Sequence, residues 1–181
     1  MRTKYFFLLG LLFNLSFSQL QQLPIIPKPK IFKVEEGVFV LSKETVLQAK
    51  NNSFEAQFLQ KAILQRTGIE LKIEANPKAE LIINLSLLVP SNADFNKELH
   101  TVSITNSYIQ IQAASNQGLF YGIQSLIQLI PFEKKLEIKL TTTEIVDQPK
   151  FKWRGLHLDV SRHFFSKDFV KKYIDYLAMY K

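Results

Sequence analysis

The 181-residue sequence contains no cysteine, and this absence excludes a disulfide framework, a zinc–thiolate site, an iron–sulfur cluster and a thiol nucleophile. Glycine and proline are also scarce, with six and seven residues, which excludes a collagen-like repeat and a Gly/Ser-rich flexible chain. Apolar residues make up 46% of the sequence and charged residues 22%. These proportions are typical of a folded globular protein that is long enough to bury a core.

The formal net charge of +7 is concentrated at the two ends of the sequence. Residues 1–18 carry two basic residues and no acid, whereas residues 19–149 contain thirteen residues of each sign. Residues 150–181 contain eight basic and three acidic residues. A nucleic-acid-binding domain is expected to cluster basic residues along its folded body. The neutral body therefore indicates that nucleic acid is not a partner.

Residues 1–18 have the pattern of a secretory signal peptide. Arg2 and Lys4 precede the apolar run YFFLLGLLF, and Ser16 and Ser18 place small side chains where signal peptidase reads them. The apolar run is too short to span a bilayer, and no later segment approaches that length. We expect export to the periplasm, the outer surface or the extracellular space, without a stable membrane span. An uncleaved N-terminal anchor is the alternative.

Hydrophobic periodicity predicts an α+β domain over residues 19–149. Apolar residues recur at helical spacing in 53–66 and in 115–130, and Gly68 and Pro131 mark where these helices end. Alternating patterns flank a turn at Asn106-Ser107, which predicts a hairpin. Strands are expected over residues 31–34, 38–41, 69–73, 81–85, 102–104, 109–113 and 136–140. The expected architecture is one sheet with two helices packed on it.

The pattern changes after Pro149. Alternating apolar residues predict a new strand over 156–160, followed by a loop over 161–165. Ser166 is a suitable N-cap for a helix whose apolar positions continue to Lys181. The apolar face of that helix has no partner among the predicted elements. We therefore expect residues 150–181 to be the start of an incomplete second domain.

Few motifs in the sequence carry chemistry. There is no HExxH metal motif, no GxSxG nucleophile elbow, no P-loop and no GxGxxG motif. His100, His157 and His163 are too scattered to suggest a metal site, and His157 is expected to pack as an ordinary residue of the predicted strand. We expect neither a metal nor a cofactor.

The densest polar cluster is formed by Asp159, Ser161, Arg162 and His163, at the carboxyl end of the predicted strand. In a parallel barrel, binding and catalytic groups collect at that end of the strands. The Arg162 guanidinium can there donate two aligned hydrogen bonds to sugar hydroxyls or to a carboxylate. Alternatively, Asp159 and Arg162 form an ion pair that only fixes the loop. Position in the sequence does not separate these two interpretations.

Two stretches resemble a known enzyme family. Residues 149–165, PKFKWRGLHLDVSRHFF, followed by YIDYLAMYK at 173–181, closely resemble the start of the catalytic domain of β-N-acetylhexosaminidases of glycoside hydrolase family 20. Residues 118–126, GLFYGIQSL, resemble the GxxYGxQTL helix of the family's front domain, and the proline-rich entry at 27–30 is also similar. The resemblance covers nearly the whole chain after residue 18.

The resemblance implies a (β/α)₈ catalytic barrel that removes terminal N-acetylglucosamine or N-acetylgalactosamine from glycans or chitooligosaccharides. Retaining hydrolysis would be substrate-assisted, with the acetamido oxygen attacking the anomeric carbon. The family's catalytic Asp-Glu pair comes from a later strand, and no residue of this sequence corresponds to it. Arg162 matches the family arginine that binds hydroxyls of the terminal sugar. Arg154 matches a position that we interpret as structural.

The length of the sequence limits this prediction. A (β/α)₈ barrel needs about 250 residues, whereas only residues 150–181 follow the front domain. We therefore expect a fragment of a secreted β-N-acetylhexosaminidase that has no glycosidase activity itself. The alternative is an exported carbohydrate-binding or interaction module that stands alone.

Overall fold

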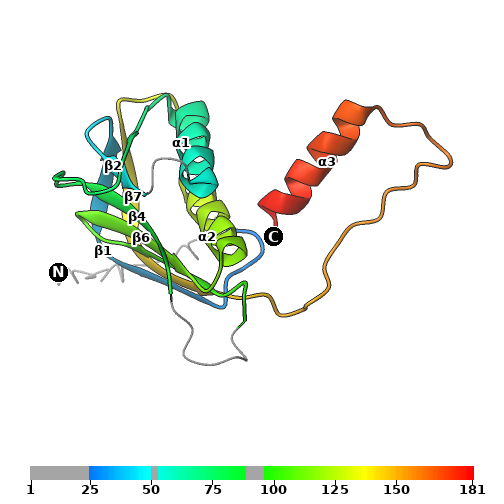
Figure 1. Ribbon diagram of the computed structural model, residues 1–181, viewed down its shortest axis with the longest axis horizontal. Helices are drawn as coiled ribbons and strands as arrows, with labels where there is room; N and C mark the ends of the chain where they lie inside the picture. The colour runs from blue at the N-terminus through cyan, green and yellow to red at the C-terminus, as the bar shows by residue number, and fades with distance from the viewer. Residues whose placement is uncertain (1–24, 50–52, 89–95) are drawn as a thin grey trace, which may run out of the picture.

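The computed structural model describes residues 25–49, 53–88 and 96–181. The expected α+β fold is confirmed: a mixed seven-stranded sheet carries two helices on one face (Figure 1). The predicted signal peptide, residues 1–18, lies outside the described residues. Within them, no helix is both long and apolar enough to cross a membrane.

The sheet combines an antiparallel half and a parallel half, in the order β1-β7-β5-β6-β4-β2-β3. Pairing is antiparallel from β1 to β6, and the predicted hairpin is confirmed as the β5–β6 pair. Parallel pairing begins where β6 meets β4 and continues to β3. The strands are β1 (Ile31–Ser42), β2 (Val46–Gln48), β3 (Lys72–Glu74), β4 (Ile82–Leu87), β5 (His100–Ile104), β6 (Tyr108–Ala113) and β7 (Glu137–Asp147).

One long strand replaces the two that were expected over 31–34 and 38–41. β1 runs through residues 35–37, which separate the two expected strands, because β7 offers ladder partners on both sides of them. The pairing register shifts between Val34 and Val38, and Gly37 has a φ of 133°. The Thr142 hydroxyl donates to the Glu35 carbonyl at 2.7 Å, which satisfies a backbone acceptor at this bulge. Residues 35–37 therefore form a bulge within one strand and do not separate two strands.

Other strand boundaries also differ from the expectation. A strand was expected over residues 69–73, but only residues 72–74 pair as a strand. Ile69 and Leu71 are buried although they precede this strand. β7 extends from the expected 136–140 to Asp147 because it is paired on both sides, by β1 and β5. The three-residue strand β2 has too short a pattern to be detected in the sequence.

Both expected helices form, and both begin at a serine N-cap. α1 (Phe54–Thr67) is capped by Ser53 and ends at Gly68, which takes a left-handed conformation with a φ of 80°. α2 (Asn116–Leu129) is capped by Ser115. Two glycines allow α2 to lie close to the sheet: a Cβ at Gly118 would be 2.8 Å from the Leu99 carbonyl oxygen. A Cβ at Gly122 would be 2.6 Å from the Ile111 side chain.

The hydrophobic core belongs to the front domain alone. Among the described residues, every fully buried hydrophobic side chain lies between Ile25 and Ile145. The core fills the space between the two helices and the sheet face that they cover. Its largest members are Ile25, Phe39, Leu41, Leu47, Leu59, Ile63, Leu71, Ile83, Ile104, Ile109, Ile111 and Ile123.

The segment after Pro149 departs from this compact domain (Figure 1). The expected helix is confirmed as α3 (Lys167–Met179), and the Ser166 hydroxyl oxygen caps it by accepting from the Phe169 amide at 3.3 Å. The expected strand over 156–160 is wrong for this structure, because no described strand lies beside it to form a ladder. The expectation that His157 packs is also wrong, because without a sheet around it the side chain is exposed.

A chain limited to residues 20–149 is expected to fold without the remainder, because the core is contained in that range. Thermal unfolding followed by circular dichroism should show one cooperative transition. A gradual, non-cooperative loss of signal would contradict a self-contained front domain.

The close approach of α2 to the loop before β5 predicts that Gly118→Ala destabilises the protein. Overpacking costs about 1–3 kcal/mol, and alanine regains up to about 1 kcal/mol of helix propensity. The net loss should be about 1–2 kcal/mol in the free energy of unfolding, measured by urea denaturation. Gly155→Ala is the matched control, because a Cβ there meets nothing within 4 Å. An equal effect of the two substitutions would refute this account of α2 packing.

Candidate functional site

The expected sugar-binding residue, Arg162, lies in an exposed turn after residues 156–160. The Asp159 Oδ1 atom accepts hydrogen bonds from the amides of Ser161 at 3.0 Å and Arg162 at 3.3 Å, which closes the turn. Asp159 Oδ2 lies 3.5 Å from Arg162 Nε, and the Arg162 side chain is 85% exposed. An ion pair this exposed contributes little to stability. The guanidinium is therefore held loosely and remains accessible to a ligand.

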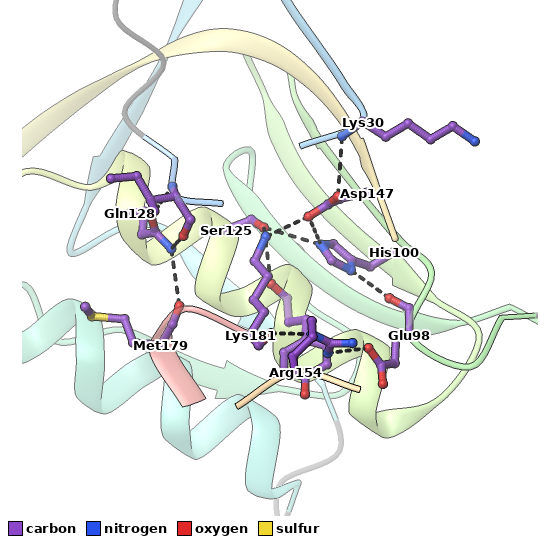
Figure 2. Close-up of polar contacts among 11 residues, drawn as sticks. Lys30, Glu98, His100, Ser125, Gln128, Asp147, Arg154, Met179 and Lys181 are labelled. Atoms are coloured by element: carbon purple, nitrogen blue, oxygen red, sulfur yellow. Dashed lines mark hydrogen bonds and ion pairs between the residues drawn. The ribbon is translucent and has the colours of Figure 1, made fainter. Parts of the chain in front are cut away.

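Arg154, in contrast, is bound on several sides at the junction with the front domain (Figure 2). Its Nη2 atom lies 2.6 Å from a Glu98 carboxylate oxygen, and Nη1 donates to the Phe151 carbonyl at 2.9 Å. Its Nε atom donates to the main-chain oxygen of Lys181 at 2.8 Å, and the guanidinium lies 5.8 Å from the Tyr121 ring centroid. These bonds give Arg154 the structural role that was expected for it.

A buried polar cluster, which sequence analysis missed, lies beside Arg154 (Figure 2). It consists of His100 from β5, Ser125 from α2, Asp147 from β7 and Lys181 after α3, and we call it the junction cluster. Lys181 Nζ lies 2.9 Å from Asp147 Oδ2 and donates to Ser125 Oγ at 2.7 Å. His100 is 2% exposed, and the side chains of Lys181 and Asp147 are 7% and 12% exposed.

One sequence signal could have pointed to part of this cluster. His100 has the same parity as the buried Val102 and Ile104, which places it on the inward face of the strand. Asp147 likewise shares a face with the buried Ile145, and the register pairs it directly with His100. No sequence spacing links these residues to Ser125 and Lys181, because four separate elements supply the cluster.

The contacts of His100 favour the neutral ring. Nδ1 lies 3.0 Å from the Glu98 carbonyl oxygen, so this nitrogen carries the proton and donates. Nε2 then carries no proton and lies 3.3 Å from Ser125 Oγ, whose hydroxyl donates to the Tyr121 carbonyl at 3.2 Å. Burial is the largest cause that lowers the pKa of His100, and the charge of Lys181 lowers it further. The Glu98 carbonyl and the charges of Asp147 and Glu98 oppose this pKa shift without reversing it.

The junction cluster does not form a catalytic triad. A Ser-His-Asp triad requires the carboxylate on Nδ1 and the hydroxyl on Nε2. Here both Asp147, at 3.8 Å, and Ser125 face Nε2, while a backbone carbonyl occupies Nδ1. Among the described residues, no group of three or more histidine or carboxylate side chains could hold a metal ion. The arrangement can hold two parts of the chain together, but it cannot activate Ser125.

The comparisons with known proteins match both parts of the chain. The model of glycosyl hydrolase family 20, domain 2, matches residues 22–148, and the model of the family's catalytic domain matches residues 151–181. A β-hexosaminidase of Porphyromonas gingivalis is 30% identical over 168 residues, which cover 87% of this chain and 21% of the relative. A β-hexosaminidase of Vibrio vulnificus is 37% identical over 105 residues, which cover 55% of this chain and 12% of the relative.

Solved structures agree with these matches. The N-acetyl-β-hexosaminidase of Streptomyces plicatus, in complex with Thio-NAglucal, has a TM-score of 0.72 and 28% identity, covering 88% of this chain and 33% of that protein. The chitobiase of Flavobacterium johnsoniae has a TM-score of 0.66 and 30% identity, covering 87% and 26%. The chain thus spans 12–33% of the length of these four proteins.

The fold and the order of the matches define a two-part chain of the glycoside hydrolase class, in which a sheet-and-helix domain precedes the start of a catalytic domain. More specifically, the chain belongs to glycosyl hydrolase family 20, as the sequence resemblance indicated.

The neutral, buried His100 predicts a loss of stability in acid. Its folded-state pKa is lowered, so below about pH 6.5, the ordinary pKa of histidine, the unfolded chain binds a proton that the folded chain resists. This contribution to stability is complete above that pH and is lost as the pH falls below it. His100→Gln should flatten the decline in the free energy of unfolding between about pH 7 and about pH 5, measured by urea denaturation. An unchanged slope would show that His100 does not titrate in this way.

Proposed function

We propose that this chain supplies the front domain and the first barrel unit of an exported β-N-acetylhexosaminidase that removes terminal N-acetylglucosamine or N-acetylgalactosamine. The observation that carries the proposal is the tandem family match, with domain 2 over 22–148 and the catalytic domain over 151–181. The names of the Porphyromonas and Streptomyces relatives, both β-hexosaminidases, support the substrate class. The pattern of residues 1–18 supports export.

Arg162 is proposed to bind the terminal sugar. In a parallel barrel, the turn after the first strand lies at the mouth, where substrate binds. The exposed guanidinium carries five donors in a planar fork, and its ion pair with Asp159 is too weak to prevent it from turning to a ligand. Two N–H groups can then bind vicinal hydroxyls of the sugar. Asp159 keeps the turn closed through its two amide contacts while the guanidinium is engaged.

The proposed reaction is retaining and substrate-assisted, with the acetamido oxygen of the sugar as the nucleophile. Its catalytic Asp-Glu pair corresponds to no residue of this sequence. The 181-residue chain is therefore expected to leave an aryl N-acetylglucosaminide intact, as assayed by release of the aryl group. Turnover by this chain would contradict the assignment of catalysis to later residues.

The alternative, a stand-alone carbohydrate-binding module, is supported by the self-contained core of the front domain. Calorimetric titration of residues 20–149 with N-acetylglucosamine and chitobiose distinguishes the two functions. The enzyme proposal expects no heat of binding from this domain, because it places the sugar at Arg162. Saturable binding would favour the module.

Arg162→Lys tests the proposed sugar contact in a protein in which residues 1–181 precede a complete catalytic barrel. Lysine keeps the charge but loses the planar fork. A charge-assisted hydrogen bond is worth about 1.5–3 kcal/mol, so loss of two should lower kcat/KM by roughly 10²-fold or more.

Arg66→Lys is the matched control, because Arg66 bonds the Ile130 carbonyl within the front domain at 2.9 Å. It should leave kcat/KM on an aryl N-acetylglucosaminide near the value of the unmodified protein. If Arg162→Lys behaved like this control, the assignment of Arg162 would be wrong.

A further inference from the structure

The hydrogen bonds between α3 and the front domain lie at the C-terminal end of the helix. No residue of α3 is fully buried, and Phe169, Ile174 and Tyr176 are exposed. Figure 1 shows that the helix points its last turn toward α2, while its first turn lies far from the sheet. The half-buried positions of the helix are Val170, Tyr173 and residues 177–179. Apolar burial therefore does little to fix the position of α3.

Polar contacts with the front domain fix the position of α3 instead (Figure 2). Gln128 Nε2 donates to the Met179 carbonyl at 3.3 Å, and Arg154 holds the main-chain oxygen of Lys181. Lys181 makes two further contacts, because its ammonium binds both Asp147 and Ser125 within the junction cluster. Asp147 and Ser125 lie on β7 and α2, two elements that are fixed by the core.

We propose that Asp147 and Lys181 are positioning residues that form a latch, through which the front domain sets the place of the first barrel helix, and that protonation of His100 opens this latch. The proposal builds on the proposed function in one respect: the turn that carries Arg162 directly precedes α3, so the latch also restrains that turn. The latch itself is a property of the described chain.

The charges around His100 explain why a proton would open the latch. The charged groups that face the ring are Asp147 from β7, Lys181 after α3, and Glu98 from the loop before β5. Asp147 is matched by Lys181, and Glu98 is matched by Arg154. The cluster is thus balanced only while His100 is neutral. An added proton introduces an unmatched charge into a buried site.

The geometry directs that proton to the latch. With Nδ1 already donating to the Glu98 carbonyl, the second proton must go to Nε2. This atom lies 3.8 Å from Asp147 Oδ2, the same oxygen that holds Lys181. Imidazolium and ammonium would then compete for one carboxylate oxygen while repelling each other. A cavity of about 570 Å³, lined in part by His100, Asp147 and Lys181, gives water access to this point.

Hydrogen exchange of the 181-residue chain, followed by mass spectrometry, tests the latch without substrate. Lys181→Met removes the ammonium from outside the front domain, so amides of β5 and β7 should keep their protection. Amides of α3 should lose protection by roughly tenfold or more, because a buried pair is broken and a detached helix of this length is marginal in water. Lys171→Met is the control, since Lys171 is an exposed lysine of the same helix. Equal protection of α3 in the two variants would overturn the proposal.

The pH dependence tests the role of His100. Between about pH 7.5 and about pH 5, protection factors of α3 should fall in the unmodified chain and stay constant in His100→Gln, which has no titrating ring. A parallel fall in both chains would overturn the pH-sensitive part. Because neither experiment measures hydrolysis or sugar binding, a failure here leaves the proposed function untouched, and a failure of Arg162 to bind sugar leaves the latch untouched.

Discussion

The carboxylate of Asp147 joins three segments that are distant in sequence. It accepts a hydrogen bond from the Lys30 amide at 3.4 Å and binds the Lys181 ammonium at 2.9 Å. Asp147 is also the last residue of β7, the strand that pairs with both β1 and β5. A largely buried carboxylate requires such partners. The entry to the front domain, the sheet and the end of α3 therefore meet at this carboxylate.

Stability and relative position come from different interactions in this molecule. The apolar core between Ile25 and Ile145 supplies the burial that holds the front domain together. A buried ion pair contributes little net stability, because desolvation offsets most of its attraction. The Asp147–Lys181 pair instead defines which surface of the front domain the first barrel helix meets.

Close packing of α2 makes the junction possible. Without a Cβ, Gly122 lets the helix approach Ile111 and His100 on the sheet. Ser125, three residues further along the same helix, then reaches His100 Nε2 and Lys181 Nζ. Gln128, another three residues on, reaches the main chain of Met179. One face of α2 thus packs on the sheet and also presents the polar groups that hold α3.

The contrast between α3 and residues 156–160 follows from where each finds its hydrogen bonds. A helix satisfies its backbone internally, so α3 forms with its Ser166 cap although most of its surface is exposed. A β-strand needs at least one neighbouring strand to complete its backbone hydrogen bonds, and none of the described strands lies beside 156–160. The same alternating pattern that marks a barrel strand is therefore left unpaired here.

Local patterns in the sequence were sufficient to determine the two-helix, one-sheet class, the Ser166 cap, the β5–β6 hairpin and the family, because each depends on residues that are near in the chain. The continuity of β1 through Gly37 and the length of β7 were decided by strand pairing across more than a hundred residues. The junction cluster was likewise decided by tertiary structure alone. His100, Ser125, Asp147 and Lys181 share no motif, and only the packed sheet and helices bring their charges within reach of one another.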